Sequence, residues 1–250
     1  MKFSVITVCR NSAPVLKNAM RSLASQRGAE YEWVVVDGAS TDGTQDLVRG
    51  FDAAPLQFVS EPDGGIYDAM NKAVRMARGD YVFFLNSDDC LAAPNVLARV
   101  AAAIDAAPVP PALVIGQVYF VHEHQRILRS YDHLGPHSVL FDSLCHQASF
   151  AQRSAFDRHG PFDTVYRLAA DFDWLARVIR AHERVLHVDV VVAEFAAGGA
   201  HARAAATTFD EVMRVRRSQA GALELALTHA LAWLRHKSRR AVGLPARGRP

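Results

Sequence analysis

Short apolar runs alternate with amphipathic stretches over the first hundred residues. Runs rich in β-branched and aromatic residues predict strands at 3–9, 31–36, 56–60 and 81–85. Apolar positions at helical spacing predict helices after each strand, the first capped by Asn11 and Ser12 and the second capped by residues 40–43. Strands that alternate with helices in this way predict an α/β fold with a mostly parallel central sheet flanked by helices.

The polar residues that follow these strands are expected to meet. Right-handed crossovers bring the carboxyl ends of parallel strands to one edge of a sheet, where ligands of such folds bind. The residues at these ends are 9–11, Asp37, Glu61 and 86–89. The sequence therefore predicts one composite site from segments far apart in the chain.

The strand at 81–85 ends in the most informative of these segments, Asn86-Ser87-Asp88-Asp89. Carboxylates at the end of a buried strand are oxygen ligands that suit Mg²⁺ or Mn²⁺, and these ions hold diphosphates. No glycine-rich loop follows the first strand, so a phosphate would not be held by backbone amides alone. The alternative is a polar loop that caps the next helix, because aspartates also begin turns.

The chain changes character after the Pro-Val-Pro-Pro tract at 108–111. Beyond it the pattern predicts strands at 113–121 and 126–131, helices at 154–159 and 171–181, and a strand at 185–195. From Phe209 on, the chain is predicted to be helical and basic.

Composition and charge narrow the class of protein. Half of the 250 residues are hydrophobic, which allows a packed core and excludes global disorder. A formal net charge of +2 argues against a nucleic-acid binder. The widely spaced Cys9, Cys90 and Cys145 indicate neither a disulfide framework nor a CxxC metal site, and favour the cytoplasm. No apolar stretch reaches the roughly 18 residues of a membrane helix, so the catalytic part is expected to be soluble.

Four segments, in this order, resemble family-2 glycosyltransferases of the GT-A fold. They are SVITVCRN at 4–11, VDGASTDGT at 36–44, SEPDGGIYDAMNK at 60–72 and LNSDD at 85–89. The third is particularly similar to bacterial polysaccharide-assembly transferases. The resemblance implies inverting transfer of a sugar from a nucleotide diphosphate donor, with Mn²⁺ or Mg²⁺ on the diphosphate. It also implies a nucleotide-sugar-binding half at 1–107, an acceptor and catalytic half of the same domain at 108–205, and a tail at 206–250.

The resemblance assigns the first two strand ends to the base of the nucleotide. Asp37 accepts an N–H of the base, and Thr7, Cys9 and Asn11 line the same pocket through side chains or backbone. The alternative for Asp37 is to hold the loop up to Thr41, and Asn11 is equally a candidate helix cap.

The start of the third helix carries four more candidates for donor binding. In the resemblance, the segment with Asp63, Asp68, Asn71 and Lys72 closes over the nucleotide and the sugar. The alternative is a turn at Asp63 and an exposed i,i+4 ion pair between Asp68 and Lys72.

Asp88 is the expected metal ligand, and Asp89 either shares the ion or contacts the ribose side. The family's motif often begins with Asp where this chain has Asn86, whose amide can bond a ribose hydroxyl without bringing charge. The division of roles between the two acids therefore stays open. His201, in a stretch similar to the family's late loop, is a further candidate for the metal or the diphosphate.

Asp171 matches the second acid of the family's catalytic pair, whereas Ala170 replaces the first. An inverting transfer needs one carboxylate to take the proton of the acceptor hydroxyl, so Asp171 is the expected base, with N-capping as the alternative. Asp173 is expected to point away from it. His146 and Gln147 are candidates for contact with the donor or acceptor sugar, and a buried structural histidine is the alternative.

The tail leaves two interpretations open. An apolar helix with Trp233 near its end, followed by a basic cluster at 235–240, suits the inner face of a membrane and a polyprenyl-linked acceptor. The alternative is a helix that packs on the core or on a second copy.

Other protein classes are disfavoured or remain open. A nucleotidyltransferase, a dehydrogenase or a methyltransferase should carry a glycine-rich loop after the first strand, and residues 9–12 are not one. A non-catalytic nucleotide-sugar-binding or scaffold protein remains the alternative, because Asn86 and Ala170 depart from the family's pattern.

Overall fold

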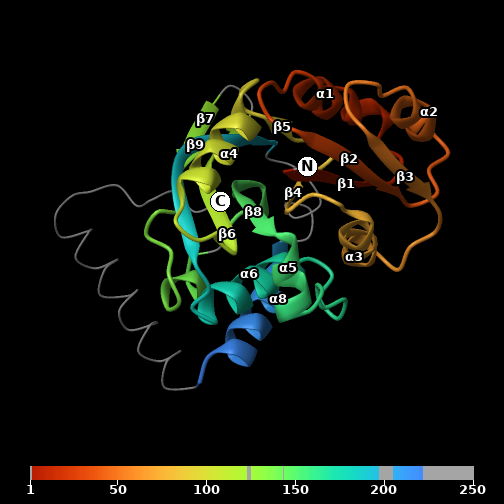
Figure 1. Ribbon diagram of the computed structural model, residues 1–250. Coiled ribbons are helices and arrows are strands. Elements are labelled where there is room, and N and C mark those ends of the chain that lie inside the picture. Colours follow the sequence, from red (N-terminus) through yellow and green to blue (C-terminus); the bar gives the residue numbers. More distant parts are fainter. Residues whose placement is uncertain (1, 123–124, 143, 197–204, 222–250) are drawn as a thin grey trace.

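A mixed β-sheet with helices on both faces organises the chain in a computed structural model (Figure 1). The structure describes residues 2–122, 125–142, 144–196 and 205–221. The predicted parallel half is present. Its strands are β1 (Phe3–Cys9), β2 (Tyr31–Asp37), β3 (Leu56–Ser60) and β4 (Tyr81–Phe84), and its helices are α1 (Ala13–Ala24), α2 (Thr44–Arg49) and α3 (Ile66–Met76).

The order of these strands creates a switch in the direction of the chain. Across the sheet these strands lie in the order β3-β2-β1-β4, and all neighbours are parallel. The chain adds β2 and β3 on one side of β1 and then places β4 on the other side. Helices α1 and α2 lie on one face of this part of the sheet and α3 on the other (Figure 1). Ligands of open α/β sheets bind at such a switch point, outside the carboxyl ends of the strands.

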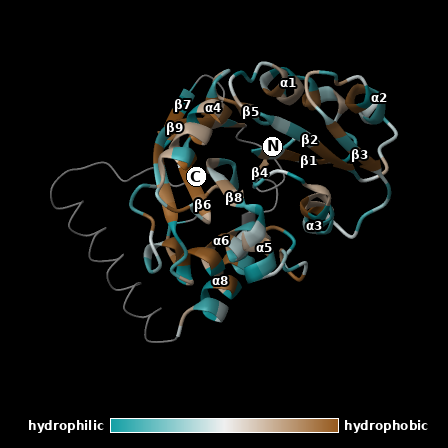
Figure 2. Cartoon of the chain, in the orientation of Figure 1, coloured by the Kyte–Doolittle hydropathy of each residue, from teal (hydrophilic) through white to brown (hydrophobic). Residues whose placement is uncertain are grey.

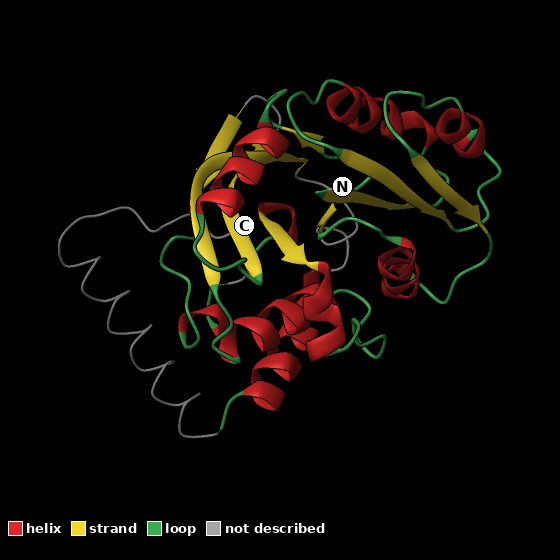
Figure 3. Ribbon diagram, in the orientation of Figure 1, coloured by secondary structure: helices red, strands yellow, loops and turns green. Residues whose placement is uncertain are grey.

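The second half of the chain extends the same sheet. Antiparallel β8 (Ser149–Gln152) joins β4 to β6 (Leu113–His122), which pairs with β7 (Gln125–Arg129) and with β9 (Val185–Ala196), and β5 (Cys90–Leu91) pairs with β9. The remaining helices are α4 (Val96–Ala106), α5 (Arg153–His159), α6 (Ala170–Arg180) and α8 (Ala205–Gln219). Figure 3 shows one continuous sheet behind both halves.

Large apolar side chains join the two halves in a single core. Strands of both halves carry brown, hydrophobic stretches in Figure 2. The ring of Phe83 on β4 stacks on that of Phe150 on β8, with centroids 4.6 Å apart. Trp174 on α6 stacks on Phe156 on α5, with centroids 4.0 Å apart. Because these rings are buried, the strand ends of the first half and the helices of the second half are held in fixed relative positions.

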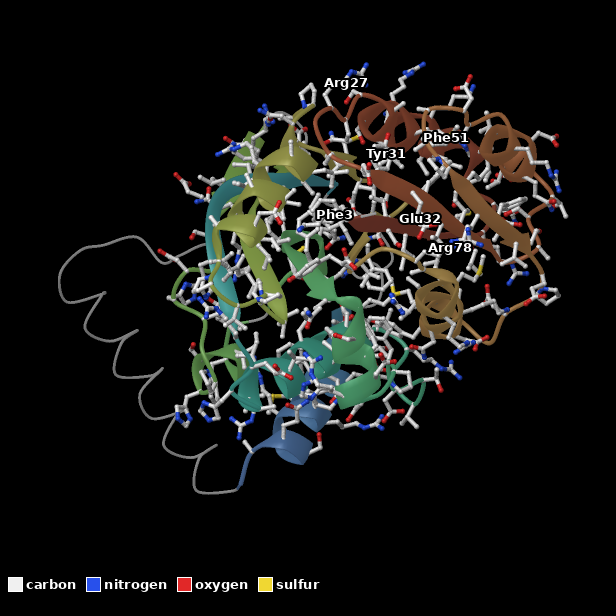
Figure 4. All side chains as sticks on the ribbon, in the orientation of Figure 1. Phe3, Arg27, Tyr31, Glu32, Phe51 and Arg78 are labelled. Carbon is white, nitrogen blue, oxygen red and sulfur yellow. The ribbon has the colours of Figure 1, made fainter. Side chains whose placement is uncertain are left out.

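A buried carboxylate joins the strands at the edge of the sheet opposite the predicted site, where β1 and β2 begin. Glu32 on β2 accepts hydrogen bonds from the Ser4 hydroxyl, the Gln57 amide and the backbone N–H of Arg78, each 2.6 Å long. Figure 4 labels Glu32 and Arg78 on this edge. The carboxylate thus ties β1, β2, β3 and the end of α3 together, and burying it is tolerated because donors surround it.

The predicted cap of the first helix is wrong. Neither Asn11 nor Ser12 caps α1 with its side chain. Instead, Asp42 accepts the N–H of Ala13 at 3.0 Å, and the hydroxyl of Thr44 accepts the N–H of Ser12 at 2.8 Å. The start of α1 is therefore held by the loop after β2, a contact between distant segments that local sequence does not reveal.

Helix α8 is the described part of the predicted tail, and it packs on α6. Its Val215 is fully buried. None of the helices within the described ranges is both long and apolar enough to cross a bilayer. Trp233 and the basic cluster at 235–240 lie outside the described residues.

Candidate active site

The loops that follow β1, β2 and β3 meet at one edge of the sheet, as the sequence predicts. The N–H of Gly38 donates to the carbonyl of Cys9 at 2.8 Å, and the N–H of Glu61 donates to the carbonyl of Asp37 at 3.0 Å. Asn11, with a left-handed φ of 50°, accepts the N–H of Thr41 through its side chain at 3.0 Å. These bonds join three strand ends that lie far apart in the sequence.

Asp37 holds this junction from inside. Its carboxylate is fully buried and accepts the Ser40 N–H at 2.9 Å, the Ser60 hydroxyl at 2.6 Å and also the Ser40 hydroxyl. The Cys9 thiol lies 3.7 Å from the same carboxylate. Burial first, and then the neighbouring negative charge, raise the pKa of Cys9 to about 12, so the thiol stays protonated.

The side chain of Thr7 lies in the core beneath this edge of the sheet. It is fully buried, donates to the carbonyl of Leu85 at 2.8 Å and accepts the indole N–H of Trp33 at 3.0 Å. The assignment of Thr7 to the base pocket, through its side chain or its backbone, stays a prediction. The Thr7 hydroxyl joins β1, β2 and β4 below the site.

Gly38 allows the loop after β3 to approach the end of β2. A Cβ atom at Gly38 would lie 2.7 Å from Oδ2 of Asp63 and 3.3 Å from Cδ of Arg10. The other oxygen of Asp63 accepts the N–H of Gly65 at 2.9 Å. The Asp63 carboxylate is thus brought to the same edge as the first two strand ends.

The remaining candidates around α3 make contacts that the sequence did not predict. Asp68 accepts the N–H of Gly64 at 2.9 Å, whereas Lys72 pairs with Glu61 and forms no i,i+4 pair with Asp68. Asn71 is buried on the same face of the helix as Tyr67.

Both polar atoms of the Asn71 amide are engaged by one residue of the second half. Its nitrogen donates to the carbonyl of Phe162 and its oxygen accepts the N–H of Phe162, each at 2.9 Å. The assignment of Asn71 to donor binding stays a prediction. The side chain fixes α3 against the segment that leads to α6.

The structure separates the two adjacent acids after β4. Asp89 is buried and accepts the Gln147 amide N–H at 2.8 Å, and the Cys145 thiol in turn contacts the Gln147 oxygen. Asp88 is only half-buried, and among the residues that the structure describes no side chain bonds to its carboxylate. Asp88 is therefore the more exposed of the two acids.

Asp171, at the start of α6, lies in a chain of polar contacts. Its Oδ1 accepts the phenol of Tyr67 at 2.8 Å, and its Oδ2 lies 2.8 Å from Nδ1 of His146. Nε2 of His146 lies 3.4 Å from Oδ1 of Asn86. An ionised carboxylate can only accept, so Nδ1 of His146 is the donor of this pair when Asp171 is ionised. The contacts connect α3, α6 and the loop after β4.

The Asp171 carboxylate is nearly but not fully enclosed. The side chains of His146 and Asp171 are 9% and 13% exposed. Burial first, and then the neighbouring Asp171 charge, hold the pKa of Tyr67 well above its ordinary value, so the phenol remains a donor. Asp173 points away, as predicted, toward Arg177 and Gln219.

Sequence reasoning missed Tyr67. Its spacing from Met70 and Asn71 places it on the buried face of α3, which indicates a core position, and only the fold brings its phenol to a residue 104 positions away. A pocket of about 270 Å³ opens beside it and is lined by Gly64, Gly65, Ile66, Tyr67, Asp68, Thr164, Tyr166 and Arg167.

The residues present fit a metal that is shared with a ligand. In the described ranges, no group of three or more His, Cys, Asp or Glu side chains forms a complete metal cage. Mg²⁺ and similar ions on nucleotides instead use one or two carboxylates together with substrate phosphates. Asp88, with its available carboxylate at the switch point, suits that arrangement. His201 lies outside the described residues.

A parallel α/β half, an acidic loop after β4 and an enclosed carboxylate at the start of α6 fit a glycosyltransferase of the GT-A fold. The model of glycosyl transferase family 2 matches residues 4–158. The chain belongs to this family, and it is a glycosyltransferase.

Relatives and solved structures agree with this assignment. A PGL/p-HBAD biosynthesis glycosyltransferase of Mycobacterium bovis (strain BCG / Pasteur 1173P2) is 38% identical over 200 residues, which cover 77% of this chain and 76% of the relative. TarS 1-349 of S. aureus in complex with UDP-GlcNAc superimposes with a TM-score of 0.73 at 24% identity, over 88% of this chain and 66% of that chain. The mannosyltransferase PcManGT of Pyrobaculum calidifontis, in complex with GDP-Man and Mn²⁺, superimposes with a TM-score of 0.63 at 21% identity, over 93% of this chain and 80% of that chain.

Proposed function

We propose that the chain is a metal-dependent, inverting glycosyltransferase. It moves a sugar from a nucleotide diphosphate donor to a hydroxyl of a saccharide or polyprenyl-linked acceptor in polysaccharide or glycolipid biosynthesis. The observation that carries the proposal is the Asp171 carboxylate, held by Tyr67 and His146 and connected through Asn86 to the acidic loop after β4.

The donor binds at the carboxyl edge of the first half, residues 1–107. The loops held by Asp37 form the base pocket, with Cys9, Asn11 and Asp63 beside it. For Asp37 to contact the nucleotide base directly, the hydroxyl of Ser40 or Ser60 would have to break its hydrogen bond to the Asp37 carboxylate. Asp68 and Lys72 lie at the adjacent start of α3 and approach the diphosphate and sugar.

Asp88 holds the Mn²⁺ or Mg²⁺ ion of the donor, and Asp89 supports the loop from below. The ion, when bound, neutralises charge on the departing nucleoside diphosphate. Asn86 is placed to bond a hydroxyl of the ribose or the sugar, and its Oδ1 lies 3.4 Å from Nε2 of His146. Mn²⁺ in the PcManGT complex and the available carboxylate of Asp88 support this assignment.

Asp171 acts as the general base. It removes the proton of the acceptor hydroxyl while the oxygen of that hydroxyl forms a bond to the anomeric carbon. The bond from this carbon to the phosphate oxygen breaks, and its electron pair leaves with the nucleoside diphosphate. Direct displacement inverts the anomeric centre and requires no enzyme nucleophile. Tyr67 and His146 aim the carboxylate, because each contacts one of its two oxygens.

The acceptor enters from the second half, residues 108–205. The pocket beside Tyr67 lies next to the base and is open enough for part of a sugar. It presents aromatic surface from Tyr166 and a charged side chain from Arg167, which are the groups that commonly contact saccharides. The name of the mycobacterial relative supports an acceptor in glycolipid assembly.

Donor binding and transfer test the proposal together. The unfolding temperature is measured with a panel of nucleotide diphosphates and their sugars, with and without Mn²⁺, where a ligand at a hundred times its Kd adds about 2.7 kcal/mol of stability. Transfer to saccharide and polyprenyl-phosphate-linked acceptors is then measured for the wild type and for Asp171→Asn. NMR of the product gives the configuration at the anomeric carbon.

We expect a Mn²⁺-dependent shift with one nucleotide family, an inverted product, and in Asp171→Asn unchanged donor binding with transfer reduced about 10² to 10⁴ fold. A scaffold protein would bind nucleotide sugars equally in both proteins and would transfer with neither. A retained anomeric configuration would contradict the direct displacement.

A further inference from the structure

Helix α8 contacts the segment that carries the catalytic base, although it lies beyond the part of the chain that the family model matches. Its Glu211 is buried. One carboxylate oxygen of Glu211 accepts the N–H of Arg167 at 2.9 Å, and the other accepts those of Leu168 at 2.7 Å and Ala169 at 3.1 Å. Three consecutive backbone donors thus converge on one side chain from 42 to 44 residues away.

These donors lie immediately before α6. The helix begins at Ala170, and Ala169 provides no side-chain cap. Backbone N–H groups at the start of a helix lack partners within it, so the direction in which a chain enters a helix depends on what binds this turn. Glu211 fixes the three residues of the turn, and Asp171 follows two positions after the last of them.

A second side chain of α8 holds the first turn of α6. The amide of Gln219 donates to both the backbone carbonyl and Oδ1 of Asp173, each at 2.8 Å. Val215, between the two bracing residues, is fully buried. Glu211 therefore binds the backbone just before Asp171, and Gln219 binds Asp173 just after it. The orientation of the Asp171 carboxylate relative to Tyr67 thus depends on α8.

Helix α8 also contacts a residue that lines the pocket beside Asp171. Tyr166 and Arg167 line this pocket, and the guanidinium of Arg214 on α8 lies 5.2 Å from the centre of the Tyr166 ring. The segment at 164–169 is exposed on its outer side at Val165. Contacts from α8 are thus the ones that order both the pocket wall and the turn before the base.

We propose that Glu211 is a positioning residue for catalysis, which acts by holding the turn at 167–169 so that Asp171 points at the acceptor hydroxyl. The inference rests on the proposed role of Asp171 as the base. It predicts that loss of the Glu211 carboxylate lowers kcat and leaves donor binding unchanged, because the donor site lies at the other strand ends. A residue that only stabilises the fold would lower the unfolding temperature without changing kcat per folded molecule.

The test compares Glu211→Gln with Asp210→Asn. Glutamine keeps the volume of Glu211 but places an NH₂ group against backbone donors, whereas Asp210 is exposed on the same helix and loses the same charge. For each variant kcat, KM for donor and acceptor, and hydrogen exchange of the amides of residues 167–169 are measured at a temperature where the protein is folded. Gln219→Ala is the second variant if Glu211→Gln does not fold.

We expect Glu211→Gln to lower kcat at least tenfold, to change donor KM less than twofold and to speed exchange at 167–169, while Asp210→Asn matches the wild type. Unchanged kcat in Glu211→Gln, or in Gln219→Ala where that variant is used, overturns the proposal. If the wild type binds nucleotide sugars but transfers none, the proposed function is refuted instead. In that case unchanged hydrogen exchange at 167–169 in Glu211→Gln still overturns the positioning role on its own.

Discussion

The phenol of Tyr67 donates a hydrogen bond to Oδ1 of Asp171 over 2.8 Å, although 104 residues separate the two in the chain. The bond crosses from the helix that follows the third strand to the helix that carries the proposed base. With His146 on the other oxygen, the carboxylate is held from two sides. Catalysis by this base should therefore depend on residues from both halves of the chain.

Replacing Tyr67 by Phe should lower kcat about tenfold, because a hydrogen bond to a charged group contributes about 1.5–3 kcal/mol. The ring stays packed on Phe162, 5.7 Å away between centroids, so donor KM should change little, while loss of the bond should also lower the free energy of unfolding by about 1.5–3 kcal/mol. Steady-state kinetics of Tyr67→Phe, His146→Gln and the double variant measure the effect. Strictly additive losses in the double variant would show that the two residues do not act on one carboxylate.

The two acids after β4 should respond differently to substitution. Asp88→Ala removes the available carboxylate, so the Mn²⁺-dependent stabilisation by nucleotide diphosphates should disappear while the unliganded protein unfolds at its normal temperature. Asp89→Ala leaves the buried Gln147 amide without its acceptor and should lower the free energy of unfolding by about 1–3 kcal/mol. Thermal unfolding with and without ligand measures both, and the reverse pattern would make Asp89 the main metal ligand.

Asn71→Ala should destabilise the protein and leave donor binding intact. It leaves the buried N–H and carbonyl of Phe162 without partners, which should lower the free energy of unfolding by about 2 kcal/mol or more. Urea denaturation and nucleotide titration of the same variant measure the two properties. Lost nucleotide affinity at normal stability would instead return Asn71 to the donor site.

Stability should decline in alkaline solution. Burial is the main cause that raises the pKa of Tyr31, Tyr67, Tyr81 and Tyr131, with the pKa of Tyr81 near 12. Above about pH 10 the unfolded chain loses phenol protons that the folded chain keeps, so each such tyrosine lowers the free energy of unfolding by up to about 1.4 kcal/mol per pH unit. Below that pH the contribution is fully present.

Urea unfolding of the wild type, Tyr67→Phe and Tyr119→Phe between about pH 8 and pH 11 tests this expectation. Tyr67→Phe should show a shallower decline than the wild type, whereas Tyr119→Phe, at a half-buried position, is the control. Equal slopes in all three proteins would mean that Tyr67 ionises as easily in the folded chain as in the unfolded one.

The sequence by itself determined the parallel half and the edge on which the site forms. The apolar runs at 3–9, 31–36 and 81–85 follow from burial of both faces of the sheet, whereas 56–60 forms the half-buried edge strand. Parallel connection then brings the carboxyl ends together. The short strands β5 and β8 escaped prediction, because two to four residues carry too little periodicity to be recognised.

Only the tertiary structure decided which candidate side chains remain available. Asp88 and Asp89 are adjacent and chemically identical, and the turn after β4 buries one against Gln147 and leaves the other at the edge. Thr7 and Asn71 have the right chemistry for a ligand, but partners from distant segments engage them.

Tyr67 and Glu211 gained their proposed roles in the same way, through contacts with residues that are remote in the chain. Local sequence sets which groups can donate or accept and on which side of an element they lie. The partner of a buried polar group is chosen by the packing of the whole chain, since the group must be satisfied by whatever donor or acceptor the fold brings within about 3 Å.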